Sequence, residues 1–254
     1  TGFMTSAATG NLLLAVLAAV LTGALLWLFH GWLAIRFKVD QIISGTVINI
    51  LAVGLTGYFY QANVVTRGKL EPLALPGLAG LPVVGEVLFN YPPITYLALL
   101  LVLVTHVVLF HTRWGLRMRA VGEHPRAADT LGVNVIGMRY ANVMLSGALA
   151  GLAGAFLTLE AVGSFERLMT NGRGFIALAA MIFGKWTPLG AWGAALLFGL
   201  ANAVQTQLQF LGLSAIIPHQ FIGMLPYVLT LVILAGFMGR ARPPAAVGQP
   251  YTTE

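Results

Sequence analysis

Long apolar stretches recur along the whole chain, and they constrain its fold more than any other feature. A helix that crosses a bilayer needs about 20 mostly apolar residues. Stretches of this kind, one of them shorter, lie at roughly 11–35, 42–60, 94–111, 140–160, 175–185, 191–210 and 219–238. The pattern predicts an all-α, polytopic transmembrane helix bundle with about seven spans.

Composition excludes the soluble classes of protein. Hydrophobic residues make up 58% of the chain and charged residues 9%, whereas soluble domains carry about 25% charged residues. So few charges could not cover the surface of a soluble fold. The absence of cysteine excludes disulfides and thiolate metal sites. The net charge of +6 is confined to short loops, so we expect membrane lipid rather than nucleic acid around the chain.

The basic residues also predict a topology. Of the 14 Lys and Arg residues, ten lie in four loops that alternate to one side, and four lie on the other side. The positive-inside rule places the richer side in the cytoplasm. We therefore expect a transmembrane domain at 1–239, with a cytoplasmic segment at 113–139, followed by a polar cytoplasmic tail at 240–254. The ten Lys and Arg residues of the richer side lie in the loops 36–41, 112–139, 185–190 and 239–254.

Small residues recur at four-residue spacing inside two spans. Gly147 and Gly151 are one such pair, a second row runs from Ser146 to Gly154, and Ala195 and Gly199 form another pair. Such rows allow helix backbones to approach closely in lipid. They predict tightly packed helices.

The polar segment between the third and fourth spans contains a short helix. Pro125 suits its first turn and Gly132 its end. Within it, Ala127, Ala128 and Leu131 are predicted to share a small apolar face. A helix this short is unstable alone, so it needs a surface to dock on. That surface is either its own bundle and the lipid headgroups or another protein.

Three stretches resemble the permease subunits of ABC importers, in particular those for simple sugars and nucleosides and, more distantly, branched-chain amino acids. They are Ala120–Ala128 with Leu131-Gly132-Val133, Phe37–Asn49 and Gly172–Trp186. The resemblance implies a type II ABC importer permease fold in the bacterial plasma (inner) membrane, and an ATP-driven importer for nucleosides or simple sugars.

The same resemblance implies partners and a coupling site. Two permease subunits, identical or related, would form the pathway, two separate ABC ATPase subunits would drive it, and an extracytoplasmic substrate-binding protein would deliver the solute. Family members carry helices before the position of Thr1, so we expect this chain to lack its N-terminal helices. The residues implied to contact the ATPase are Glu123, His124, Pro125, Arg126, Ala127, Ala128, Leu131 and Gly132.

No phosphate-binding loop of the Walker type is present in the sequence. Gly68-Lys69 and Gly184-Lys185 lack the rest of that motif. We therefore expect a transport subunit without its own ATPase site, rather than an enzyme. The five histidines lack the spacing of metal ligands, and no cofactor is expected.

Polar residues within spans are candidates for the solute pathway. Asn202, Gln205 and Gln209 share one face of the sixth span, and Thr46 and Asn49 lie in the second. Amides both donate and accept hydrogen bonds, which suits an uncharged, polyhydroxylated solute. Hydrogen bonding between helices explains such residues equally well. That second explanation is favoured for Asn142 and Ser146.

Other function classes remain as alternatives. An ion-coupled carrier usually needs ionisable groups inside the membrane, and no Asp, Glu, Lys or Arg lies in the middle of a span. The lone His106 is expected to be a hydrogen-bonded packing residue. An intramembrane enzyme needs paired catalytic residues, which we do not find. Within the permease class, a branched-chain amino acid is the second candidate solute.

Two loops on the outer side mix positive and negative charges. They are Ser164–Arg167 and Arg67–Glu71. These charges either dock the substrate-binding protein or are simply solvated.

Overall fold

The computed structural model describes residues 1–60, 66, 68–74, 85, 89–211, 221, 224, 228, 232 and 241–252. The predicted seventh span at 219–238 lies largely outside the described residues. The chain divides into two compact units. The first unit comprises Thr1–Leu101, Arg117–Asn171 and Ala246–Glu254, and the second comprises Val102–Leu116 and Gly172–Ala245.

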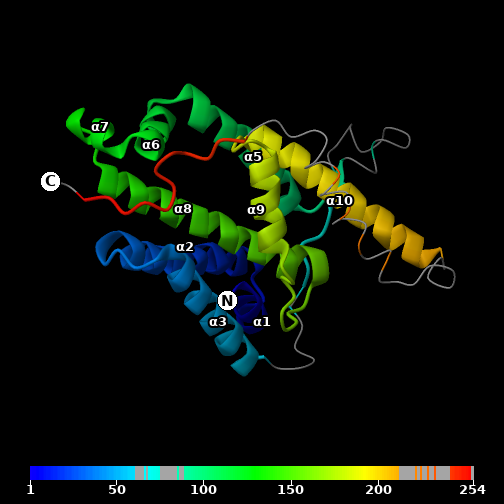
Figure 1. The fold of residues 1–254 in the computed structure, drawn as a ribbon. Coiled ribbons are helices and arrows are strands. Elements are labelled where there is room, and N and C mark those ends of the chain that lie inside the picture. The colour runs from blue at the N-terminus through cyan, green and yellow to red at the C-terminus, as the bar shows by residue number, and fades with distance from the viewer. Residues whose placement is uncertain are drawn as a thin grey trace. The chain divides into compact units, whose positions relative to one another are not determined.

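Helices dominate both units (Figure 1). The first unit contains α1 (Gly2–Thr9), α2 (Leu12–Arg36), α3 (Gln41–Tyr58), α7 (Pro125–Thr130), α8 (Val135–Ala155) and the π-helix η1 (Phe156–Val162). The second contains α9 (Arg173–Phe183) and α10 (Pro188–Phe210), while α5 (Pro93–His111) and α6 (Arg113–Glu123) belong partly to each. The strands β1 (Leu73–Ala74) and β2 (Asn90–Tyr91) pair antiparallel, a small exception to the predicted all-α class.

Four of the described helices are long and apolar enough to cross a membrane. They are α2, α3, α5 and the continuous Val135–Val162 formed by α8 and η1, and they match the predicted first four spans. The fifth predicted span is α9, whose 11 residues are shorter than a crossing requires. The sixth is α10, which has 23 residues but carries several amides in its last turns.

Polar side chains set the points where the spans begin. The side chain of Asn11 accepts hydrogen bonds from the amides of Leu13 and Leu14 at the start of α2. Asp40 does the same for α3. Asn134 accepts from the amide of Gly137, so α8 begins at Val135 rather than near the predicted residue 140. Each cap satisfies backbone donors that a helix start leaves free.

Helices α2 and α8 form a tight antiparallel pair. A Cβ added to Gly147 would lie 2.4 Å from the carbonyl oxygen of Gly23 and 2.3 Å from the Cβ of Trp27. One added to Gly151 would lie 2.3 Å from the carbonyl oxygen of Ala19. Backbones this close require glycine, which confirms the packing predicted for Gly147 and Gly151.

The other predicted small-residue positions do not lie in such contacts. A Cβ added to Gly154 or to Gly199 would meet nothing within 4 Å in the described part of the chain. The four-residue spacing therefore predicted where small residues recur, but not which of them contact a neighbouring helix.

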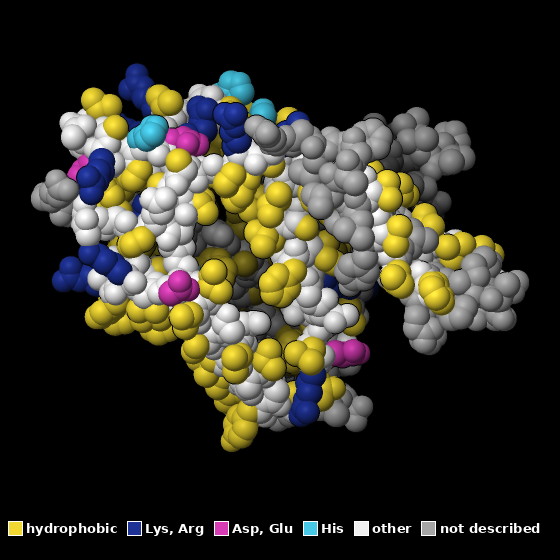
Figure 2. Space-filling model, viewed as in Figure 1, with side chains coloured by type: hydrophobic (Ala, Val, Ile, Leu, Met, Phe, Trp, Pro, Cys, Tyr) yellow, Lys and Arg dark blue, Asp and Glu magenta, His cyan; other side chains and the backbone are white. Residues whose placement is uncertain are grey.

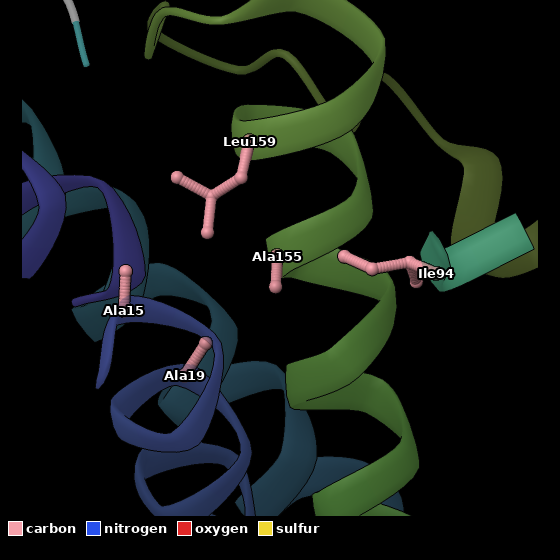
Figure 3. Packing of buried hydrophobic residues seen from close by; sticks show 5 residues of the cluster. All are labelled: Ala15, Ala19, Ile94, Ala155 and Leu159. Atoms are coloured by element: carbon pink, nitrogen blue, oxygen red, sulfur yellow. The ribbon is translucent and has the colours of Figure 1, made fainter. Parts of the chain in front are cut away.

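A small apolar core closes the end of this pair at which α2 begins. It contains Ala15 and Ala19 of α2, Ala155 and Leu159 of α8–η1, and Ile94 of α5 (Figure 3). Alanines on one side and a larger side chain on the other let the helices interlock without voids.

The outward faces of the spans are apolar, as a lipid-facing surface requires. Hydrophobic side chains follow α3 in Figure 2. Lys and Arg side chains gather instead over α6 and α7. Because α2 and α8 are antiparallel, Arg36 and Asn134 lie at one end of the pair, which agrees with the prediction that loops 36–41 and 112–139 share a side.

The second unit has its own core. Ala180 of α9 packs with Ala194 and Phe198 of α10. The rings of Phe183 and Phe198 stack with centroids 5.7 Å apart. The side chain of Thr187 caps α10 through the amide of Gly190, so the turn and the core together hold α9 against α10.

Candidate functional site

The segment 113–139, which the resemblance implies to be the coupling segment, contains the short helix that the sequence predicts. Helix α6 ends at Glu123, and α7 begins at Pro125 and ends at Thr130. Gly132 follows with φ of 81°, a left-handed conformation that favours glycine. The amide of Val133 donates to the carbonyl of Ala128 and returns the chain to α8. Pro125 and Gly132 therefore bound the helix as expected.

The three apolar residues of this segment do not share a face. Ala128 is 3% exposed and packs with Val121 of α6 and Val135 of α8. Ala127 and Leu131 are exposed, Leu131 by 85%. The predicted common face is therefore wrong: within α7 only Ala128 of these three faces its own unit, and Leu131 lies in the turn beyond the end of the helix. One side of α7 docks on its own unit, and Arg126, Ala127 and Leu131 form an outer surface.

Residues 246–252 lie against the same segment. The amide of Ala246 donates to the carbonyl of Gly122, 2.9 Å away. Nη1 of Arg139 donates to the carbonyl of Gln249, also at 2.9 Å. The Tyr251 hydroxyl donates to Oδ2 of Asp129 at 2.6 Å. Figure 1 shows this red segment between α6 and α8. It was predicted only as a polar tail, and no local pattern signals these contacts.

The candidate pathway residues occupy two different helices. Thr46 and Asn49 are exposed on α3 in the first unit, and Thr46 donates its hydroxyl to the carbonyl of Ile42. In the second unit, Asn202 and Gln209 are exposed on α10 and Gln205 is half-buried. Among the described residues, no other helix bonds to these amides. Their contact with a solute stays a prediction.

Two buried polar atoms lack the partners expected for them. Oδ1 of Asn142 and Nδ1 of His106 are buried and accept no hydrogen bond from the residues described. The ring of His106 instead lies 5.0 Å from that of Phe110. His106 therefore packs as expected, but the hydrogen bonds expected for His106 and Asn142 are not found at these two atoms among the described residues.

Glu160 is the residue that sequence reasoning missed. It lies in the π-helix η1 and is 3% exposed. Its carboxylate accepts from the amide of Ile94 at 2.8 Å, from the amide of Thr95 at 3.1 Å, and from the Thr95 hydroxyl. It thereby caps α5 from a distant part of the chain. The signal was an acidic residue at the end of a predicted span, 140–160, that is otherwise uncharged.

The outer-side charges are tied to their own unit. Nζ of Lys69 donates to the carbonyl of Ala161 at 3.0 Å. Nη2 of Arg167 reaches the carbonyl of Gly57, and its guanidinium lies 5.0 Å from the centroid of the Tyr60 ring. These two side chains hold loops together, which neither the docking nor the solvated interpretation predicted. No cluster able to hold a metal ion occurs among the described residues.

Comparison with known proteins finds similarity along most of the chain. Residues 1–234 match the family model described as the branched-chain amino acid transport system permease component. The guanosine ABC transporter permease protein NupQ of Bacillus subtilis (strain 168) is 44% identical over 245 residues, which cover 94% of this chain and 77% of the relative. The nucleoside ABC transporter permease protein NupC of Lactococcus lactis is 41% identical over 245 residues, which also cover 94% of this chain and 77% of the relative.

A further relative is described as a putative sugar permease. The putative glucose ABC transporter permease protein of Haloferax volcanii is 34% identical over 279 residues, covering 100% of this chain and 85% of the relative. No solved structure matches the chain. These matches confirm the predicted permease resemblance, fold class and multi-pass inner-membrane location. The chain belongs to the family of branched-chain amino acid transport system permease components.

Proposed function

We propose that this permease subunit carries nucleosides, and that separate ABC ATPase subunits drive it through α7. The observation that supports the solute is the 44% and 41% identity to guanosine and nucleoside permeases across 94% of the chain. The candidate pathway residues are uncharged amides and a hydroxyl, which can bond to a ribose and a base without separating charge.

Simple sugars are the second candidate solute. The relative named as a putative glucose permease is 34% identical and matches the whole chain. Uptake of labelled guanosine by the reconstituted transporter distinguishes the two candidate solutes, with other unlabelled nucleosides, ribose, glucose and leucine as competitors. We expect competition by other nucleosides alone. Competition by leucine and not by nucleosides would refute the proposal.

The outer surface of α7 supports ATPase docking. Ala128 anchors the helix on its own unit, and the exposed Ala127 and Leu131, with Arg126 beside them, would face the partner. Leu131 is 85% exposed, and burying such a leucine contributes about 1.5–3 kcal/mol. A second permease subunit and an extracytoplasmic substrate-binding protein complete the proposed importer. Hydrolysis belongs to the ATPase subunits, because this sequence has no Walker motif.

The docking surface is testable by one substitution with a matched control. Leu131→Asp should reduce nucleoside uptake per ATP hydrolysed at least about tenfold, since it buries a charge in the proposed contact. Leu168 is 66% exposed in the loop after η1, on the predicted outer side, so Leu168→Asp should leave coupling unchanged. Equal coupling in the two variants would refute docking at α7. Uptake that survives ATP depletion and collapses with the ion gradient would instead indicate a secondary carrier.

A further inference from the structure

Residues 246–252 contact the coupling segment at three separate elements. The amide of Ala246 meets the end of α6, the carbonyl of Gln249 meets α8, and Tyr251 meets α7. The chain positions joined are 110 apart for Arg139 and Gln249 and 122 apart for Tyr251 and Asp129. Closing loops of that length costs conformational entropy, which these contacts together must offset.

Tyr251 makes contacts of three chemical kinds. Its hydroxyl donates to Oδ2 of Asp129 over 2.6 Å, a length typical of a strong hydrogen bond to a carboxylate. Its ring packs against the cluster of Val121, Ala128 and Val135. The guanidinium of Arg139 lies 5.7 Å from the ring centroid, within cation–π range. One side chain therefore reaches α6, α7 and α8.

Helix α7 needs such an anchor. It has six residues, well below the length at which a helix is stable alone. Ala128 contributes only a methyl group to the core beneath it, and a methyl contact restrains rotation poorly. The hydrogen bond from Tyr251 to Asp129 adds a second, directional point of attachment on the same helix. Two points fix how the remaining side of α7 is presented.

We propose that residues 246–252 form a latch on the coupling helix, with Tyr251 as the positioning residue that fixes the orientation of α7. This inference rests on the proposed function, in which Arg126, Ala127 and Leu131 face the ATPase. The latch occupies the side of α7 that carries Asp129 and Ala128. It therefore holds the helix without covering Leu131, and a push from the partner reaches α8 instead of rotating α7.

Hydrogen exchange of residues 125–132 tests the latch in the complete transporter in lipid nanodiscs. Tyr251→Phe removes the hydroxyl alone, and the loss of one hydrogen bond to a charged group should speed exchange about tenfold. Tyr251→Ala removes the ring as well and should speed it further. Thr252 is the exposed neighbour, so Thr252→Ala is the control and should match the wild type. Unchanged exchange in Tyr251→Ala would overturn the proposal.

Coupling is the readout that a merely structural contact would not change. In Tyr251→Phe, uptake per ATP hydrolysed should fall several-fold while the ATPase subunits still co-purify. Faster exchange with full coupling would overturn the positioning role. A separate variant tests the docking proposal. If α7 does not dock on the ATPase, Leu131→Asp will leave uptake per ATP hydrolysed unchanged, and this result does not depend on the exchange rates of the Tyr251 variants.

Discussion

Removing the carboxylate of Glu160 should loosen the start of α5. The side chain is 3% exposed, and its oxygens accept from two backbone amides and one hydroxyl. Glu160→Ala leaves the amides of Ile94 and Thr95 without an acceptor in an apolar setting. The Thr95 hydroxyl can rotate toward another acceptor, so the two amides decide the cost.

The magnitude follows from those two amides. An unsatisfied buried donor costs about 1–3 kcal/mol, so with two such donors Glu160→Ala should destabilise this region by about 2–6 kcal/mol. Glu160→Gln keeps one carbonyl oxygen and should cost about 1–2 kcal/mol. Thr95→Val removes only the hydroxyl bond and should cost about 1 kcal/mol. The expected order of the three variants is as informative as the values.

Hydrogen exchange at the first turn of α5 measures this cost where it arises. With a factor of 10 for each ~1.4 kcal/mol, the amides of Ile94 and Thr95 should exchange at least about 25-fold faster in Glu160→Ala than in the wild type. Glu166 lies exposed in the loop after η1, so Glu166→Ala should change exchange little. An increase of less than about twofold in Glu160→Ala would refute the argument that this carboxylate caps α5.

Two further predictions use other parts of the first unit. Gly147→Ala should destabilise the α2–α8 pair by well over about 1 kcal/mol, because the added Cβ would lie 2.4 Å from a backbone oxygen. Gly154→Ala is the control: its Cβ would meet nothing within 4 Å among the described residues, so it should be neutral or stabilise by about 1 kcal/mol. Equal thermal stabilities of the two variants would contradict the packing. The hydrogen bond to Asp129, as the larger cause, and burial, as the smaller one, raise the pKa of Tyr251 above its ordinary value. The hydrogen bond needs the protonated hydroxyl, so it should be complete below about pH 10. It should be lost as the pH rises through the raised pKa. Tyrosinate absorbance of wild type minus Tyr251→Phe reports this step, and an ionisation of Tyr251 below its ordinary pKa would contradict the contact.

Features set by local sequence were predictable. The first four spans followed from apolar length. The ends of α7 followed from Pro125 and Gly132, because a proline at a first turn and a glycine beyond a last turn act within a few residues. The small-residue spacing of Gly147 and Gly151 anticipated a close helix contact. The missed α1 is eight residues long, short enough that its pattern is not distinctive.

Features set by distant contacts were not predictable. The partner of Glu160 is 66 positions away at Ile94, and the partner of Tyr251 is 122 positions away at Asp129. Which of Ala127 and Ala128 is covered depended on where α6 and α8 lie around α7, and the position of Leu131 depended on the residue at which α7 ends. The lining of a solute pathway depends on helices facing one another, which spacing along one helix does not determine.

The glycine contacts between α2 and α8 restrict how this permease can move. Sliding one helix along the other by a turn would drive side chains into backbone at the positions now occupied by Gly23, Gly147 and Gly151. Sliding within the pair should therefore cost much more than tilting, and we expect the two helices to tilt together as one body. With 28 residues from Val135 to Val162, the continuous helix of α8 and η1 is about 40 Å long. A small tilt of this helix near α7 would move Glu160 at its far end. Because Glu160 bonds to Ile94 and Thr95, the first turn of α5 would move with it.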